Sequence, residues 1–99
     1  MLHTVNKSPF EKNSLDSCLS VAASGSAVLL IEDGVYGAIE GSVAADKVKA
    51  AMESVTIYAL ESDVKTRGIA GKVIEGIKLV DYAGFVGLAC EHSKVNSWL

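Results

Sequence analysis

The chain has 99 residues, of which 49% are hydrophobic and 21% are charged, and its formal net charge is −3. This composition excludes intrinsic disorder, and the length suits one domain built around a single modest core. The charge argues against a dedicated nucleic-acid binder, in which positive side chains gather on one face. Because so small a monomer does not easily hide this much apolar surface, the composition predicts an interface with another subunit.

The N-terminus and the two cysteines indicate where the protein works. Residues 1–7 lack the charged start and apolar stretch of a secretion signal, and no apolar run approaches the ~20 residues that span a bilayer. Cys18 and Cys90 form neither a disulfide framework nor a CxxC or Cys/His zinc pattern. The sequence therefore predicts a soluble cytoplasmic protein with two free thiols.

Four short apolar segments, separated by helical or loop segments, predict the strands of a parallel sheet. The strongest is Ala27–Ile31, an unbroken apolar run that ends at the sequence Glu-Asp-Gly. Continuous apolarity is typical of a strand that is covered on both faces. The other three segments are Leu2–Val5, Thr56–Leu60 and Ile77–Val80. Their alternation with helical segments predicts an α/β fold with right-handed crossovers.

Apolar residues at three- and four-residue spacings predict the helices between these strands. The predicted helical or turn segments are 14–23, 34–39, 44–52, 62–68 and a final helix after Asp81. Asn13 or Ser14 is expected to cap the first helix and Asp81 the last. The last helix should bury an apolar stripe formed by Tyr82, Phe85, Val86 and Ala89. Gly84 and Gly87 weaken this helix by roughly 1 kcal/mol each, which suggests that another element packs closely against it.

The carboxyl ends of the strands are where sites form in an open parallel sheet. Three of these four ends are acidic, which would repel a phosphate, and no GxGxxG, GxxxxGK[ST] or GxSxG motif is present. Glu32 and Asp33 suit acid/base work or cation binding, but the commoner role for such a pair is to end a strand and cap a helix. His3, inside a predicted strand, is more typical of a hydrogen-bonded core or interface residue than of a catalyst. His92 is expected to complement the dipole at the end of the last helix.

Cys18 is the candidate site residue. Its spacing from Leu15 and Ala22 places it on the buried side of the first helix, where a small packing residue is the alternative to a reactive thiol. Reactivity would require exposure and a lowered pKa of this thiol. Cys90, late in the last helix, has the pattern of a structural residue. Trp98 stands in a tail with no evident core to join, which favours an anchor into a partner or a groove.

Several segments taken together are similar to one family. The chain opens with MLHTVNKSPF at 1–10, continues with LLIEDGVY at 29–36 and carries IYAL at 57–60. It then reads VDYAGFV at 80–86 and has a nearly terminal Trp98. This ordered set resembles the DsrH/TusB family of sulfur-relay proteins over essentially the whole chain. Cys18 matches a cysteine of DsrH-type members that TusB-type members can lack, so the chain looks more DsrH-like.

The resemblance implies a single domain, residues 1–99, with a three-layer α/β/α sandwich around a small, mainly parallel sheet. It implies a subunit of a heterohexamer with DsrE/TusD-like and DsrF/TusC-like chains, which passes persulfide sulfur to a DsrC/TusE-like acceptor protein. The main sulfur-carrying cysteine of such complexes belongs to the DsrE/TusD-like partner. Cys18 would then be an auxiliary persulfide acceptor, and no function carries over to Cys90. No cofactor, no metal and no direct contact with nucleic acid or membrane is expected.

The main prediction is a subunit of a sulfurtransferase complex in cytoplasmic sulfur oxidation. One alternative is a TusB-type subunit that serves 2-thiolation of the tRNA wobble uridine. Another is a purely structural assembly subunit with no chemistry of its own, so the sequence leaves open whether the chain acts as an enzyme. A third class, an independent small-molecule-binding protein, rests on the acidic strand ends alone.

Overall fold

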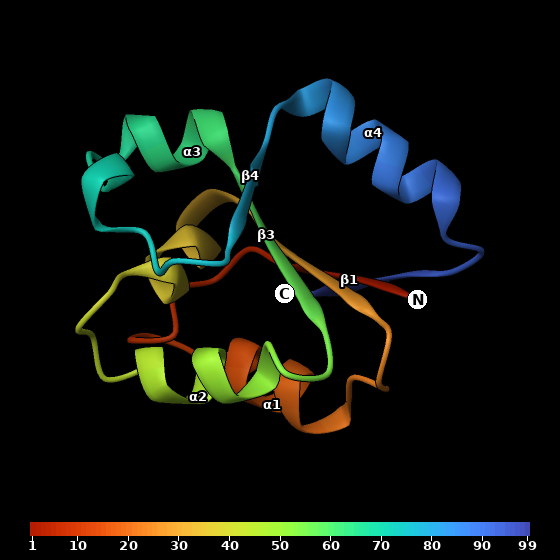
Figure 1. Cartoon of the computed structure of the whole chain (residues 1–99), viewed down its shortest axis with the longest axis horizontal. Coiled ribbons are helices and arrows are strands. Elements are labelled where there is room, and N and C mark those ends of the chain that lie inside the picture. Colours follow the sequence, from red (N-terminus) through yellow and green to blue (C-terminus); the bar gives the residue numbers. More distant parts are fainter.

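The computed structural model describes residues 1–99 and contains one five-stranded sheet with helices on both faces (Figure 1). The strands are β1 (Leu2–Val5), β2 (Ala27–Leu30), β3 (Thr56–Leu60), β4 (Lys78–Val80) and β5 (Val95–Trp98). They lie in the order β4-β3-β2-β1-β5, and every neighbouring pair is parallel. The predicted α/β sandwich and its four strands are confirmed, and β5 is a strand that the sequence analysis did not predict.

Short helices connect these strands. They are α1 (Ser14–Val21), the 3-10 helix η1 (Glu32–Ala38), α2 (Ala45–Ala51), α3 (Glu61–Thr66), the 3-10 turn η2 (Ala70–Lys72) and α4 (Tyr82–Glu91). Asp81 caps α4 as predicted, because its Oδ1 accepts a hydrogen bond from the backbone N–H of Gly84 at 2.8 Å. Asn13 occupies the capping position of α1, but its side chain makes no capping bond. No helix of the chain combines the length and the apolar character that crossing a membrane requires.

The order in which the chain visits the strands explains why the two faces of the sheet carry different helices. From β1 to β4 the chain moves steadily toward one edge, whereas α4 brings it back across the sheet to β5 at the opposite edge. Right-handed crossovers that run in opposite directions lie on opposite faces of a sheet. Accordingly, α1 and α2 lie side by side below the sheet in Figure 1, and α4 lies above it.

The face of the sheet that α1 and α2 cover holds the larger core. Sixteen buried residues form it, and they come from the sheet, α1, α2, η1, α3 and the loops around them. Because strand residues alternate between the two faces, Val5, Val28 and Leu30 point into this core. Removal of their side chains from water is the main force that holds the sheet to these helices.

The face of the sheet that α4 covers holds a smaller core of four buried residues, Leu2, Ala27, Leu29 and Leu88. Leu88 is the one buried residue of α4, although Glu91 is the only charged residue in that helix. Tyr82 is 70% exposed and Val86 is 49% exposed, so the predicted inward stripe is wrong at these two positions. The exposed residues of α4 that precede its last residue, Glu91, are called the α4 outer face below; they are Tyr82, Ala83, Val86, Gly87 and Cys90.

Trp98 belongs to β5 and is partly buried against the larger core of its own chain. The expectation of a tail without a core to join is therefore wrong, whereas an anchor into a partner or a groove stays a prediction. The tail was hard to place because Val95–Trp98 is half polar and pairs with β1, at the other end of the chain. Local sequence patterns carry no information about such a distant partner.

Candidate functional site

Cys18 lies on the sheet side of α1, inside the larger core, and none of its surface is exposed. Burial raises the pKa of its thiol to about 11, because an apolar environment disfavours the charged thiolate. At pH 7 about one such thiol in ten thousand is ionised. The predicted position on the buried side of the helix is confirmed. Exposure and a lowered pKa are both lacking, so the persulfide-acceptor role of Cys18 stays a prediction that requires α1 to open.

Cys90 is exposed on the α4 outer face, and neither cysteine is in a disulfide. The prediction of a structural role for Cys90 is therefore wrong. Nearly every residue of α4 is apolar, so spacing alone could not show which side of the helix turns inward. The accessible thiol of this chain is the one to which the family resemblance assigns no function.

An ion-pair network occupies the carboxyl ends of β2 and β3. The guanidinium of Arg67 binds Asp33 Oδ1, at 2.8 Å through Nη2 and at 2.9 Å through Nε. Its Nη1 lies 3.5 Å from Asp63 Oδ1. The other carboxylate oxygen of Asp63, Oδ2, accepts a hydrogen bond from the backbone N–H of Glu32 at 2.7 Å. These contacts join α3 to the start of η1.

The same contacts give structural roles to Glu32 and Asp33, the acidic pair whose sequence pattern also suited acid/base chemistry. Glu32 has a left-handed backbone with φ of +49°, which costs a non-glycine residue about 1 kcal/mol, and the bond from its amide to Asp63 helps to hold it there. Asp33 makes an ion pair and does not cap η1, which has no side-chain cap. No group of three or more His, Cys, Asp or Glu side chains is arranged to hold a metal ion. The acidic strand ends therefore give little support to an independent ligand-binding protein.

Arg67 is the residue of this network that sequence reasoning missed. Asp63 and Arg67 are four residues apart on one helix, a spacing that favours an ion pair. That signal was present in the sequence. The contact between Arg67 and Asp33 was not foreseeable in this way, because it spans 34 residues.

His3 is 4% exposed, and its Nδ1 accepts a hydrogen bond from the indole Nε1–H of Trp98 at 3.1 Å. The interpretation of His3 as a hydrogen-bonded core residue is confirmed. His92 is the C-cap residue of α4. The two histidines are therefore placed by packing and by the end of a helix, and neither makes a hydrogen bond to a nucleophilic side chain.

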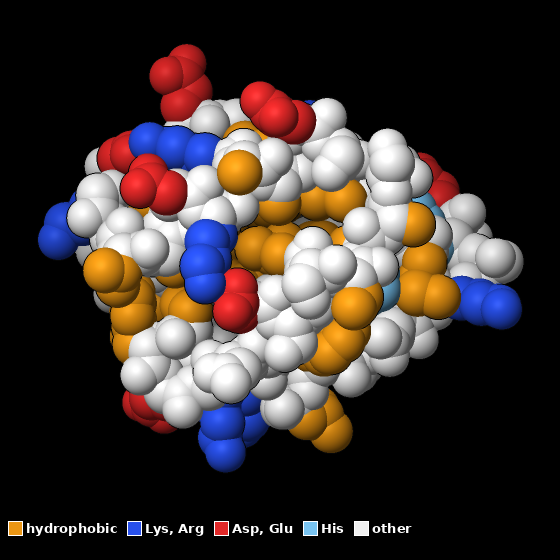
Figure 2. Space-filling model, turned by 90° about the horizontal axis from the view of Figure 1, so that it is seen from below, with side chains coloured by type: hydrophobic (Ala, Val, Ile, Leu, Met, Phe, Trp, Pro, Cys, Tyr) orange, Lys and Arg blue, Asp and Glu red, His pale blue; other side chains and the backbone are white.

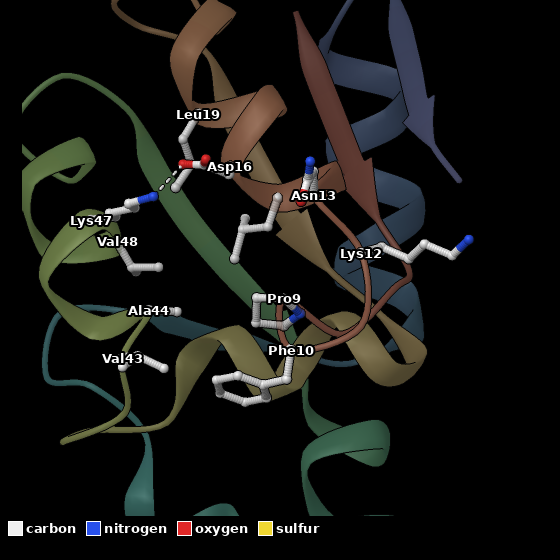
Figure 3. A pocket seen from close by; sticks show the side chains of 11 residues that line it. Pro9, Phe10, Lys12, Asn13, Asp16, Leu19, Val43, Ala44, Lys47 and Val48 are labelled. Carbon is white, nitrogen blue, oxygen red and sulfur yellow. Dashed lines mark hydrogen bonds and ion pairs between the residues drawn. The ribbon is translucent and has the colours of Figure 1, made fainter.

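A groove of about 230 Å³ opens between α1 and α2 on the outside of their layer (Figures 2 and 3). Leu15, Leu19 and Val48 contribute apolar side chains to it, and Phe10, which also lines it, is 51% exposed. The Lys47–Asp16 ion pair, at 3.0 Å, links the two helices beside this groove, as the dashed line in Figure 3 shows. Figure 2 shows hydrophobic side chains at the bottom of hollows on this side, flanked by charged ones. The groove holds no cysteine, serine or threonine, and its lining mixes these apolar side chains with Lys12, Asn13, Asp16 and Lys47.

Comparison with known sequences gives the family. The model of a family described as DsrH like protein matches residues 7–95. TusB proteins of Enterobacter sp. (strain 638), Pectobacterium parmentieri and Shigella flexneri are 36%, 34% and 33% identical to this chain, respectively. Each alignment extends over 98 residues and covers 99% of this chain and all of the relative. The chain therefore belongs to the DsrH/TusB family, as the resemblance of its motifs predicted.

Solved structures confirm the fold. The ychN protein from E. coli superimposes with a TM-score of 0.78, at 16% identity, over 97% of both chains. MTH1491 from Methanobacterium thermoautotrophicum, a protein of unknown function, gives a TM-score of 0.74 at 13% identity, over 97% of this chain and 96% of that chain. At these identities the similarity establishes the architecture alone.

Proposed function

We propose that this chain is a TusB-type subunit of a sulfur-relay complex that serves 2-thiolation of the tRNA wobble uridine. The observation that carries the proposal is the full-length similarity, at 33–36% identity, to proteins named TusB. The sequence analysis favoured sulfur oxidation because of Cys18, and these relatives support its alternative better. The proposed partners are DsrE/TusD-like and DsrF/TusC-like chains in a cytoplasmic heterohexamer, with a DsrC/TusE-like acceptor protein.

The composition of the α4 outer face supports a permanent contact with a sister chain. It is uncharged, and it exposes Tyr82 and Val86 where a solitary protein would place charged residues. The core of a stable subunit interface is poor in charged residues and rich in aromatic ones. We therefore assign this face to a sister chain of the complex.

The chemistry of sulfur relay sets a requirement that Cys18 does not meet in the closed chain. An acceptor thiolate attacks the outer sulfur of a donor persulfide, the donor S–S bond breaks, and the donor leaves as a thiolate. The acceptor then carries the persulfide, and no net oxidation occurs. A thiol with a pKa of about 11 and no exposed surface supplies almost no thiolate for this step. Within the relay complex, this observation favours an assembly role for the chain, and the role of auxiliary acceptor is the alternative.

A reconstitution experiment tests the proposed function. The chain should co-purify with its two sister chains at the mass of a heterohexamer. In a bacterium that lacks its own TusB chain, expression of all three should restore 2-thiouridine to tRNA, as measured by mass spectrometry of digested tRNA. The matched control expresses the two sister chains alone. A strictly monomeric protein that ignores both sister chains, or tRNA that stays unthiolated, would contradict the proposal.

A second experiment separates the assembly role from the acceptor role. The complex is incubated with a persulfide donor, and sulfur is located by mass spectrometry in the wild type and in the Cys18→Ser and Cys18→Ala variants. The assembly role predicts no added sulfur on Cys18 and unchanged tRNA thiolation in any variant that still assembles. Added sulfur at Cys18, with transfer lost in both variants, would establish the auxiliary acceptor instead.

A third experiment locates the interface. Cys90 lies in the α4 outer face, so a sister chain on that face should slow its alkylation. The rate is measured for the isolated chain and for the complex by mass spectrometry. An alkylation rate that is equal in both would place the interface elsewhere.

A further inference from the structure

β5 is an edge strand with little buried surface. Val95, Asn96 and Ser97 are exposed, and Trp98 is the only residue of this strand that is partly buried. Backbone pairing with β1 is supplemented by a hydrogen bond of 3.2 Å between Thr4 and Ser97 and by the bond between Trp98 and His3. The docking of this edge strand therefore depends strongly on how Trp98 is held.

The bond between Trp98 and His3 exists only for a neutral imidazole. An indole N–H is a donor and never an acceptor, so Nδ1 of His3 must be the acceptor and its proton must lie on Nε2. An imidazolium has protons on both nitrogens. Protonation of His3 would thus turn the bond into two opposed N–H groups and would place a charge where 4% of the residue is exposed.

His3 makes no ion pair, and the bond from Trp98 is the only hydrogen bond of its side chain. Its neighbours in the sheet are Val28 on β2 and Asn96 on β5. On α1, which packs against β1, the buried titratable group is Cys18, whose thiol stays neutral.

Polar and charged groups on the elements that pack against β1 are bound elsewhere or oppose the protonation of His3. Asp16 of α1 is exposed and bound to Lys47, and the carbonyl of Leu99 after β5 accepts a bond from Ser14. Burial lowers the pKa of His3, and the positive amino group of Met1 lowers it further.

We propose that His3 and Trp98 form a proton-sensitive latch, in which protonation of His3 releases β5 and uncovers the outer edge of β1. The released state would present unpaired backbone N–H and C=O groups of β1, to which another strand can add. Since the docked state binds the neutral ring, the ratio of released to docked chains rises up to ~10-fold for each pH unit below about 6.5. This increase ends once the pH falls below the pKa of the docked histidine. The latch is independent of the proposed relay function.

The chain contains a natural reporter for this motion, because Trp98 is its only tryptophan. Its emission and its quenching by acrylamide are measured on the full chain from pH 8 to pH 5, with far-UV circular dichroism as a monitor of the helices. Below about pH 6.5 the emission should shift to the red and the quenching should increase, while the helical signal stays constant.

Two matched variants test the assignment to His3. His3→Gln keeps an acceptor for the indole and removes the titration, so it should abolish the pH dependence of Trp98. His92→Gln removes the only other histidine and should leave the pH dependence intact. Unchanged quenching at pH 5 in the wild type, pH dependence that survives His3→Gln, or simultaneous loss of the helical signal would each overturn the latch.

A measurement on the wild type decides the question if His3→Gln does not fold. NMR titration follows the rings of the two histidines separately. The latch requires that the His3 ring titrates with the same midpoint as the exposure of Trp98, and a different midpoint would overturn it.

Discussion

The two faces of the sheet are covered to different degrees, although both are apolar. The face under α1 and α2 buries sixteen residues in one cluster, whereas the face under α4 buries four. On the first face, polar and charged side chains such as Asp16 and Lys47 are turned outward. On the second, a single helix crosses the whole sheet and is apolar on both of its sides. The comparison shows that a helix without a polar side has an outer face still to be covered, and we assign that face to a partner.

The largest expected difference between the faces is in how much free energy of unfolding is lost when a buried leucine is shortened and leaves a cavity. Leu29 and Leu30 are adjacent in β2, and both have no exposed surface, but they point to opposite faces. Leu30→Ala should lower the free energy of unfolding by about 4 kcal/mol, and Leu29→Ala by about 2 kcal/mol, because the thinner layer can collapse into the cavity more easily. Urea unfolding followed by circular dichroism measures both values. Equal losses would show that the α4 layer is as rigid as the other.

A second substitution tests how closely the chain packs at the carboxyl end of the sheet. A Cβ at Gly34 would collide with the backbone carbonyl of Val5, which no side-chain rotation can relieve. Gly34→Ala should therefore lower the free energy of unfolding by about 3 kcal/mol. Gly71→Ala is the matched control, because a Cβ there meets open space. A similar, small effect of both variants in urea unfolding would show that the carbonyl of Val5 is not what requires glycine at position 34.

The reaction rates of the two thiols offer a chemical test of the difference between the two faces. Cys18 is buried under α1, and Cys90 is exposed on α4. At pH 8 the isolated chain should react with a thiol reagent at Cys90 at least ~100-fold faster than at Cys18, since Cys18 requires local opening and has a raised pKa. The Cys90→Ser variant, which retains Cys18 alone, gives the slow rate directly. Rapid reaction of that folded variant would mean that α1 opens readily, and it would revive Cys18 as a sulfur acceptor.

The smallest expected effect distinguishes the two sides of α4. A Cβ at Gly87 would meet open space, so Gly87→Ala should raise the free energy of unfolding by up to about 1 kcal/mol through helix propensity alone. A Cβ at Gly84 would lie 3.0 Å from Cβ of Val80, so Gly84→Ala should lose that gain. Thermal or urea unfolding of the two variants gives the comparison. A destabilising Gly87→Ala in the isolated chain would contradict the outward position of this glycine.

The structure confirms close packing against α4 at one of its two glycines. Gly84 permits close packing against β4 of the same chain, whereas nothing in this chain approaches Gly87. Spacing within the helix could not separate the two cases, because both glycines stand among apolar residues. The buried position of Cys18, by contrast, followed from its spacing to Leu15 because α1 has a polar side.

The sequence by itself determined the four strands β1 to β4, the cap at Asp81, the buried side of α1 and the family. These features depend on neighbours within one or two helical turns, which local patterns describe well. Only the tertiary structure decided the place of β5, the ion pair between Arg67 and Asp33 and the bond between Trp98 and His3, whose partners are 34 to 95 residues apart. It also decided which side of α4 is exposed, because the direction of the last crossover, and not the composition of the helix, places that helix alone on its face of the sheet.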